Sequence, residues 1–371
     1  MPINIIGMVG VAPAATTAVH VIGGGIDPQF LASFARTHEQ SGFDAVLVGY
    51  SSSSAEGFQV AQFCAHRTER LKFLVAHRPG FVAPTLAART AATFDNLTGG
   101  RLWLHIITGG VDADQRRDGD WLSHDERYAR TDEYLEVLRN VWTREKPFDH
   151  EGSYYRFEKA YSEVRCTQTP HVPIWFGGVS DAAIGVGARH CDVYALFGEP
   201  RAAIAESIAR VRAAAAQYGR NPRFNVSFRP IIAATESAAW AKADEILASV
   251  AQTSRPRTSE PEAETARRLV RLAARGDVHD ERLWTPIAAA SAGSGNTTAL
   301  VGTPEQVADA VARYYEIGVR GVLLRGFNPV ADAAEYGREL IPLIREKVAA
   351  IDAGLAPQAA VRRANASAPL N

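Results

Sequence analysis

Pro173-Ile-Trp-Phe-Gly-Gly-Val-Ser-Asp181 is the stretch that decides how the fold of this chain is interpreted. Its apolar run at residues 174–176 predicts a buried strand, and Ser180 is typical of the N-cap that precedes a helix. Gly177 and Gly178 lie between the two elements and let a ligand approach the backbone closely. Because the start of a helix favours an anion, we interpret this turn as a phosphate cradle.

The rest of the chain repeats the same unit, a short apolar strand followed by a helix. This alternation predicts a parallel sheet that is buried on both faces. Eight such units, with insertions at the C-terminal ends of strands, favour a (β/α)8 TIM barrel over a doubly wound open sheet. The predicted strands span residues 4–10, 45–50, 72–77, 102–108, 174–176, 193–198, 223–231 and 321–326.

The pattern predicts a single α/β domain over residues 1–350, followed by a loosely held C-terminal tail at 351–371. Residues 109–160 interrupt the alternation and are predicted to be an insertion after the fourth strand. The run at residues 288–298 is rich in Ser, Gly, Ala and Asn and has little to pack, so we expect a mobile loop.

Composition excludes several classes of protein. The 371 residues are 46% hydrophobic and carry a formal net charge of −1, so neither nucleic acid nor a membrane surface is expected as a partner. Cys64, Cys166 and Cys191 show no paired spacing and are expected to be buried, reduced thiols. The chain has no apolar run of about 18 residues and no basic signal at its start, which predicts a cytoplasmic protein.

Basic side chains stand at the predicted strand ends, where barrels of this kind place their active sites. Three arginines and two histidines with few carboxylates suit an anionic ligand, because guanidinium groups match oxyanions geometrically. They do not suit a glycosidase or a metal hydrolase, so no metal site is expected. The alternative is that Arg78 and Arg325 form salt bridges at the rim and that His105 is a core residue. The five side chains are His77, Arg78, His105, Arg229 and Arg325.

Several motifs together resemble the bacterial luciferase-like flavin monooxygenases, and most of all their alkanesulfonate monooxygenase branch. The resemblance covers about residues 3–350 and implies a (β/α)8 barrel that receives FMN as FMNH2 from a separate NAD(P)H-dependent flavin reductase and uses O2. It also implies a homodimer or tetramer and, in the sulfonate enzymes, release of sulfite and an aldehyde. The motifs are LAARTAATFD (86–95), GGR (99–101), HIITG (105–109), GD (119–120), HDERY (124–128), WFGGVSD (175–181) and TALVG (298–302).

The resemblance assigns roles to individual residues. The FMN phosphate would be held by Tyr128, Gly177, Gly178, Val179 and Ser180, and the edge of the isoalloxazine ring would be lined by His105 and Thr108. The catalytic candidates are Arg229, Ser54, His77 and Arg325.

Departures from the branch concern its substrate residues. Ser54 stands where the alkanesulfonate enzymes have a cysteine, and the basic pair of the seventh strand reads Ser227 and Arg229. After the eighth strand, Gly-Phe-Asn-Pro (326–329) replaces Gly-Tyr-Pro-His, and the loop at 288–298 has no arginine. The expected partner is a small anionic organosulfur substrate, and these differences make a sulfonated sugar or a sulfone a candidate beside a simple alkanesulfonate.

The predicted function is an FMNH2-dependent two-component monooxygenase that cleaves the C–S bond of an organosulfonate, either an alkanesulfonate or a sulfonated sugar such as sulfoquinovose. Three alternatives stay open: a dimethyl-sulfone-type monooxygenase, a deazaflavin-dependent oxidoreductase on the same barrel, and a flavin-binding sensor without turnover. The absence of a nicotinamide fingerprint fits reductant that arrives as free FMNH2.

Overall fold

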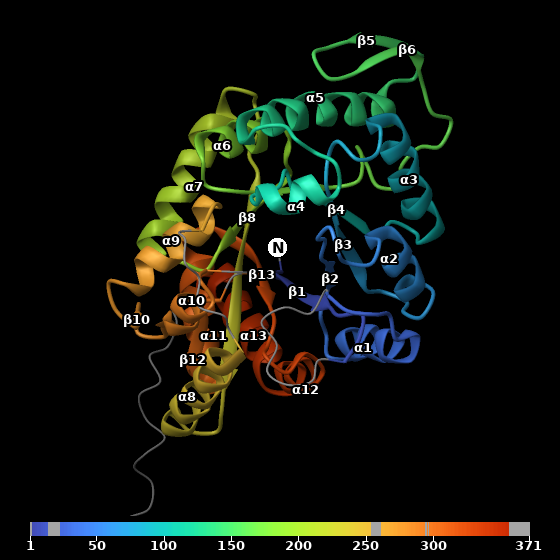
Figure 1. Ribbon diagram of the computed structural model, residues 1–371. Coiled ribbons are helices and arrows are strands. Elements are labelled where there is room, and N and C mark those ends of the chain that lie inside the picture. The colour runs from blue at the N-terminus through green and yellow to red at the C-terminus, as the bar shows by residue number, and fades with distance from the viewer. Residues whose placement is uncertain (1, 14–22, 254–260, 294, 296, 356–371) are drawn as a thin grey trace, which may run out of the picture.

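Eight parallel strands close into a barrel at the centre of the molecule (Figure 1). The computed structural model describes residues 2–13, 23–253, 261–293, 295 and 297–355. Strand β9 pairs with both β8 and β13, which closes the ring and confirms the predicted (β/α)8 fold. The strands are β1 (Asn4–Val9), β2 (Ala45–Val48), β3 (Lys72–His77), β4 (Leu102–Ile106), β7 (Ile174–Gly177), β8 (Val193–Phe197), β9 (Arg223–Ile232) and β13 (Val319–Leu324). No bound differs from the predicted one by more than two residues.

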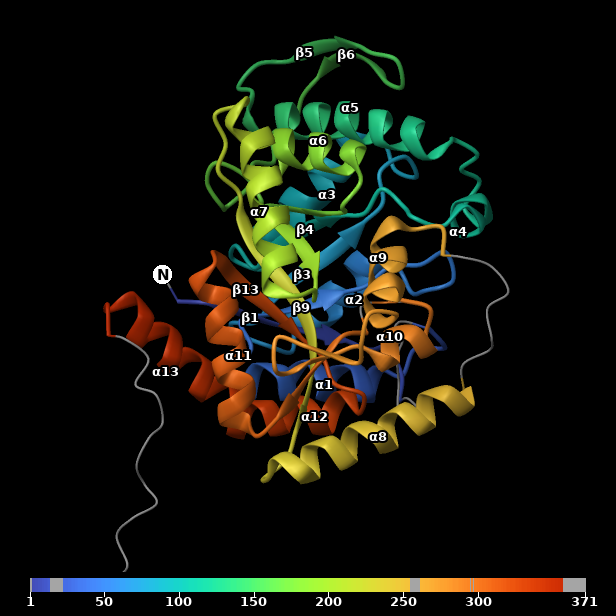
Figure 2. The same cartoon turned by 90° about the vertical axis from the view of Figure 1, so that its left-hand side faces the viewer.

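A ring of helices covers the outside of the barrel (Figures 1 and 2). Local signals start them: Asp27 caps α1, Ser123 forms a capping box at α5, and Thr303 forms another at α11. The ring comprises α1 (Pro28–Gln40), α2 (Gly57–Ala65), α3 (Pro84–Leu97), α5 (His124–Thr143), α6 (Asp181–His190), α7 (Arg201–Ala216), α11 (Pro304–Glu316) and α13 (Ile341–Asp352), with α12 (Pro329–Glu335) and the π-helix Tyr336–Leu340 leading into α13.

The segment at 109–160 contains less inserted structure than its length indicates. Helix α5 packs against α3 and α6 and therefore belongs to the ring. Outside the ring lie the short helix α4 (Asp112–Arg117) and the hairpin of β5 (Phe148–Glu151) and β6 (Arg156–Ala160). Figure 2 shows the hairpin above α5 and α4 beside the ends of the strands.

A second insertion joins β9 to α11. It contains α8 (Glu236–Thr253), α9 (Glu264–Ala273), β10 (Val278–His279), β11 (Leu283–Trp284), α10 (Pro286–Ala290) and β12 (Ala299–Gly302). Strand β12 pairs in parallel with β9 from Arg229 to Ile232, so β9 runs on beyond the barrel. Ala288 and Thr298 are fully buried, and the expectation that residues 288–298 have little to pack is therefore wrong at both ends.

Apolar side chains fill the interior of the barrel as well as the space under the helices. The interior cluster comprises Ile6, Ala45, Leu74, Trp103, Trp175, Val193 and Leu323. The rings of Trp103 and Trp175 stack with centroids 5.1 Å apart. Because side chains alternate along a strand, the residues two positions further on face the same interior at its C-terminal end. The interior packing thereby positions the mouth of the barrel, whose inward-facing residues are Met8, Leu47, Ala76, His105, Gly177, Ala195 and Arg325.

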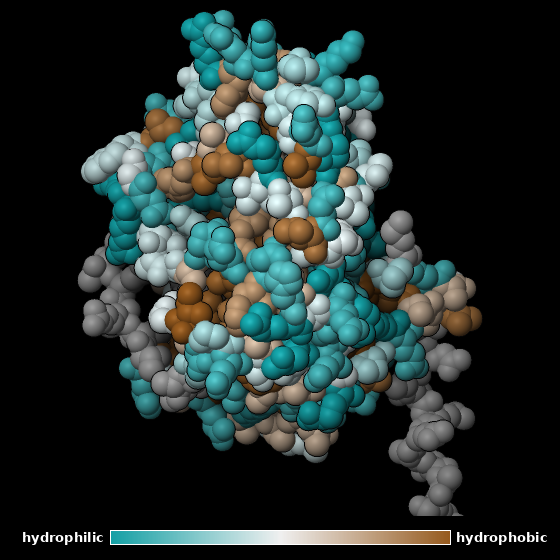
Figure 3. All heavy atoms as spheres, turned by 90° about the vertical axis from the view of Figure 1, so that its right-hand side faces the viewer, coloured by the Kyte–Doolittle hydropathy of each residue, from teal (hydrophilic) through white to brown (hydrophobic). Residues whose placement is uncertain are grey.

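The surface of the protein is mixed in polarity. On the face shown in Figure 3, hydrophobic residues form small separate patches among hydrophilic ones. Within the described part of the chain, no helix has both the length and the apolar character needed to cross a bilayer.

Cys64 and Cys191 are free and buried, as expected, whereas Cys166 is half-buried. Burial raises the pKa of the Cys64 thiol to about 12, so this thiol is un-ionised at neutral pH.

Candidate active site

The turn after β7 has the conformation that its sequence predicts. Ser180 is the N-cap of α6, and its Oγ accepts a hydrogen bond from the backbone N–H of Ala183 at 3.3 Å. Gly178 has a φ of +141°, and a Cβ at this position would lie 2.5 Å from the Cβ of Ala183. Only glycine therefore allows the backbone to pass this close to the start of α6. The first turn of such a helix directs backbone N–H groups towards the cradle that Gly177, Gly178, Val179 and Ser180 form.

Tyr128 of α5 joins this cradle from the neighbouring element. Its hydroxyl lies 3.5 Å from the position that a Cβ on Gly178 would take, and its side chain hydrogen-bonds that of Ser180. Burial raises the pKa of Tyr128, and the bond to Ser180 opposes this shift. The phenol is therefore protonated at neutral pH and is able to donate to an oxyanion. The structure thus brings together all the residues that we assigned to the phosphate.

His105 lies on the inner face of β4, next to Trp175 in the strand register. Burial lowers its pKa to about 4, so the imidazole is neutral at pH 7. Its Nδ1 is buried and has no hydrogen-bond partner among the described residues. The alternative of a core histidine with a satisfied hydrogen bond is therefore not what the geometry shows. Thr108 is buried and its Oγ1 donates to Oγ1 of Thr131 at 3.3 Å, so this hydroxyl is directed towards α5.

Arg229, which is buried, and Arg325, which is half-buried, form a basic pair where β9 leaves the barrel and where β13 ends. Arg229 is 1% exposed, its Nη1 donates to the carbonyl oxygen of Gly326 at 3.2 Å, and its guanidinium lies 4.7 Å from the ring centroid of Phe327. Burial lowers the pKa of Arg229 well below its ordinary value, and the charge of Arg325 lowers it further. Burial also lowers the pKa of Arg325 to about 10. A guanidinium group keeps its charge in proteins, so the two cations repel each other.

One carboxylate lies close to the basic pair. Asp332 accepts hydrogen bonds from the backbone N–H groups of Phe327 at 2.7 Å and Asn328 at 2.8 Å. Burial raises the pKa of Asp332, and its charge favours the protonated form of Arg229. The turn after β13 therefore orders the region around the two arginines through a single acidic side chain.

His77 and Ser54 make their hydrogen bonds with residues other than the basic pair. His77 lies on the outer face of β3, where its Nε2 is 2.6 Å from the hydroxyl oxygen of Tyr134 on α5. Burial lowers the pKa of His77 to about 4. Ser54 lies in the turn after β2, where its Oγ accepts from the N–H of Ser51 and donates to its carbonyl oxygen, both at 2.9 Å. These contacts are those of residues that hold structure in place.

Arg78 is paired within the rim of the mouth. Its Nη2 lies 2.5 Å from Oδ2 of Asp114 and its Nη1 lies 3.4 Å from Oδ2 of Asp118. The guanidinium also stacks 4.5 Å from the ring centroid of Tyr50, whose hydroxyl donates to Asp118 at 2.8 Å. The alternative of a rim salt bridge is thus confirmed for Arg78. Two carboxylates therefore already occupy this guanidinium.

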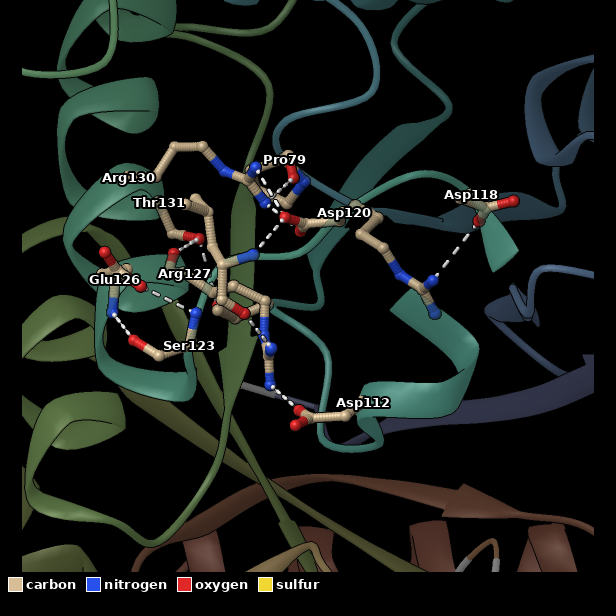
Figure 4. Close-up of polar contacts among 12 residues, drawn as sticks. Pro79, Asp112, Asp118, Asp120, Ser123, Glu126, Arg127, Arg130 and Thr131 are labelled. Atoms are coloured by element: carbon tan, nitrogen blue, oxygen red, sulfur yellow. Dashed lines mark hydrogen bonds and ion pairs between the residues drawn. The ribbon is translucent and has the colours of Figure 1, made fainter. Parts of the chain in front are cut away.

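Sequence reasoning missed the role of the charged run that follows β4. A run as charged as residues 116–120 is typical of solvated surface, yet Asp120 is 6% exposed and pairs with Nη2 of Arg130 at 2.5 Å. Figure 4 shows Arg127 and Arg130 of α5 reaching Asp112 and Asp120 on either side of α4. The carboxylates at 112, 114, 118 and 120 were the available signal, because so many acids in so short a segment match the arginines of the neighbouring strand and helix.

The donor set of the mouth consists of cations, hydroxyls and backbone amides. No group of three or more His, Cys, Asp or Glu side chains within the described residues could hold a metal ion. The cradle suits a phosphate monoester, and the unpartnered His105 Nδ1 suits a polar ring system above the interior cluster. The residues present therefore fit a phosphorylated flavin.

Solved structures with the same fold belong to several enzymes. A riboflavin lyase with modified FMN and riboflavin aligns at 20% identity and a TM-score of 0.75, covering 94% of this chain and 92% of that one. The EDTA monooxygenase from Chelativorans sp. BNC1 aligns at 18% identity and 0.74, covering 94% of each chain. An F420-dependent secondary alcohol dehydrogenase aligns at 15% identity and 0.68, covering 93% of this chain and all of that one. At these identities the likeness shows a shared fold.

The family itself is shown by a sequence model described as luciferase-like monooxygenase, which matches residues 8–321. This match confirms the resemblance at the level of the family and the enzyme class, a flavin-dependent monooxygenase. The alkanesulfonate branch stays a prediction. Since the match covers well over half of the chain, including the turn after β7 that forms the cradle, the chain belongs to the luciferase-like monooxygenase family.

Proposed function

We propose that this enzyme is a two-component monooxygenase that uses FMNH2 and O2 to cleave the C–S bond of an organosulfonate. The substrate is an alkanesulfonate or a sulfonated sugar such as sulfoquinovose. In the balanced reaction, RCH2SO3⁻, FMNH2 and O2 give RCHO, HSO3⁻, FMN and water. One oxygen atom of O2 enters the aldehyde and the other leaves as water, while the reduced flavin supplies two electrons and two protons.

The basic pair of buried Arg229 and half-buried Arg325 is the observation that carries this proposal. Burial destabilises the charged form of both arginines, and the charge of Arg325 destabilises that of Arg229 further. An anion bound between the two guanidinium groups would therefore stabilise both charges. A sulfonate offers three oxygens to guanidinium donors and remains charged at every physiological pH. A neutral sulfone carries no charge that the two guanidinium groups could attract, and for this reason we favour the sulfonate over the dimethyl-sulfone alternative.

A reduced flavin is the cofactor of this enzyme class, and FMN fits the cradle. Tyr128, Gly178 and Ser180 would bind its phosphate, and His105 would lie against the ring. The flavin, when bound, supplies the redox chemistry with O2, and the residues of the chain orient it, hold the sulfonate and exclude water. We further propose that a separate NAD(P)H-dependent reductase delivers FMNH2 and that the enzyme assembles as a homodimer or tetramer.

Sulfite release tests the proposal directly. The enzyme is incubated in air with FMN, NADH, a generic flavin reductase and a panel of sulfonates from short alkanesulfonates to a sulfonated sugar. Sulfite from one member, with the matching aldehyde, supports the proposal and identifies the substrate class. Hydrogen peroxide without sulfite across the panel would retain the flavin chemistry and overturn the sulfonate.

A deazaflavin-dependent oxidoreductase is the second candidate. The F420-dependent secondary alcohol dehydrogenase shares the fold over 93% of this chain. This likeness supports hydride transfer without O2 as the alternative reaction. Binding of F420 with no binding of FMN, and no O2 consumption, would favour this candidate.

A further inference from the structure

Gln115 carries a buried amide that the structure leaves unpaired. The residue lies on α4 and is 1% exposed. Neither its Nε2 nor its Oε1 has a hydrogen-bond partner among the described residues. A buried amide without partners costs free energy of folding, because in water both of its atoms are hydrogen-bonded. A side chain with this environment indicates a missing partner that offers one donor and one acceptor.

The amide of Gln115 lies against the end of β4. A Cβ on Gly109 would lie 1.9 Å from Nε2 of Gln115, so this glycine leaves the room that the amide takes. His105, whose Nδ1 is also buried and unpartnered, lies four residues earlier on the same segment. Two unpaired polar side chains therefore converge on the C-terminal end of one strand.

Ion pairs on both sides hold this part of the chain in place. Asp114 of α4 pairs with Arg78 of the β3 end, and Asp112 pairs with Arg127 of α5 at 2.9 Å. Asp120, which follows α4, pairs with Arg130 of α5 (Figure 4). The backbone that carries Gln115 is thus anchored to two neighbouring elements, and its amide is held in one position without a ligand.

The phosphate cradle lies on the neighbouring strand. His105 of β4 is in register with Trp175 of β7, and Gly177 at the start of the cradle is two residues further along. Adjacent strands lie about 4.8 Å apart. A ligand whose phosphate occupies the cradle therefore has the end of β4 within its reach, and this is the region that Gln115 and His105 share.

We propose that the amide of Gln115 binds the pyrimidine edge of the flavin ring and so positions it over β4. This edge presents an N3–H donor flanked by the C2 and C4 carbonyl acceptors. A side-chain amide complements it with two parallel hydrogen bonds: Oε1 accepts from N3–H, and Nε2 donates to one carbonyl. The assignment rests on the proposed flavin cofactor, and it makes Gln115 a cofactor-binding residue supplied by the inserted helix α4.

A purely structural role for Gln115 predicts a different outcome. If the amide only filled space, its replacement by an apolar side chain of similar volume would leave flavin binding unchanged. If it pairs with the flavin, replacement removes an unpaired buried group from the free protein and a pair of hydrogen bonds from the complex. Gln115→Leu and Gln115→Met should therefore stabilise the flavin-free protein and weaken its binding of flavin.

The experiment measures flavin binding by fluorescence titration and the Tm of the flavin-free protein. Two ligands are used, FMN and N3-methyl-FMN, which lacks the donor. The wild type should bind FMN about tenfold more tightly than N3-methyl-FMN, and Gln115→Leu should lose this preference. The Tm of the flavin-free variants should rise by about 1–3 °C. Gln62→Leu, which removes an amide that bonds His66 on the surface of α2, is the matched control and should bind both ligands as the wild type does.

The outcomes separate the two levels of the proposal. Equal affinity of the wild type and both Gln115 variants for FMN overturns the assignment of Gln115 and leaves the proposed function in place. A preference for FMN over N3-methyl-FMN that persists in both variants also overturns it. A wild type that binds no FMN overturns the proposed function, and the assignment fails with it.

Discussion

Nη2 of Arg78 lies 2.5 Å from Oδ2 of Asp114, and this ion pair joins the end of β3 to the inserted helix α4. Side-chain exposure is 5% for the arginine and 22% for the aspartate, so the pair is largely shielded from water. Because α4 has only six residues, it depends on such tertiary contacts for its position. The same contact removes Arg78 from the set of groups that could bind a substrate anion.

Asp114→Asn should therefore loosen α4. Removal of one charge from a shielded pair costs about 2 kcal/mol of stability, since Asp118 still partners the arginine. Hydrogen exchange of residues 109–123 should become faster while that of the barrel strands stays the same. Glu151→Gln, which breaks an exposed pair with Arg156 in the hairpin, is the control and should change neither. Unchanged exchange in Asp114→Asn would show that α4 is held by other contacts.

Tyr128→Phe should weaken FMN without affecting the fold. The loss of one hydrogen bond to a charged phosphate lowers the affinity by about tenfold. Riboflavin, which has no phosphate, should bind the variant and the wild type equally well. Tyr161→Phe removes a hydroxyl from an exposed tyrosine and serves as the control. A parallel loss of riboflavin affinity would show that Tyr128 contacts the ring and not the phosphate.

Ser180→Ala should affect both binding and stability, unlike the change at Tyr128. Its Oγ caps α6 by accepting from the N–H of Ala183, so the substitution costs about 1 kcal/mol of folding free energy. The affinity for FMNH2 should fall by a further 1 kcal/mol or so, the worth of one hydrogen bond to a charged group. Thermal unfolding and an anaerobic titration measure the two effects separately. Unchanged FMNH2 affinity would contradict the cradle.

Arg229→Ala should abolish most sulfite release while it leaves flavin binding nearly intact. Truncation of a buried cation that binds an anion costs enough to lower kcat/KM by about 100-fold or more. The affinity for FMNH2 should change by no more than about twofold, because the arginine lies where β9 leaves the barrel and the cradle lies at the end of β7. Arg223→Ala at the exposed start of the same strand is the control. A collapse of flavin affinity in Arg229→Ala would place this residue at the cofactor.

The stability of the protein should fall on acidification, in part because of His77. Burial lowers its folded-state pKa from 6.5 to about 4, so the unfolded chain binds the proton first. The stabilisation is complete above pH 6.5, declines as the pH falls towards 4, and does not change further below that value. His77→Gln cannot be protonated and should reduce the slope of unfolding free energy against pH in this window. Tyr134→Phe, which keeps the histidine buried, should lower stability but retain the slope.

The strands and the phosphate turn could be predicted from the sequence because their signals are local. An apolar run between turn residues predicts a buried strand, and β3 begins and ends at the residues that the pattern indicates. The cradle depends on the conformation of Gly178 and on the capping of α6 by Ser180, both of which are set within a few residues. Eight such units then leave a closed barrel as the favoured arrangement.

Tertiary structure alone decided which side chains meet at the mouth. Alternation along β3 requires Ala76 and His77 to point in opposite directions, but only the pairing with β2 and β4 turns the histidine outward to Tyr134. Closure of the barrel likewise brings Arg229 beside Arg325, which lies 96 residues away in sequence. Composition and spacing cannot reveal such pairs, because the energies that select them arise from desolvation and charge across distant segments.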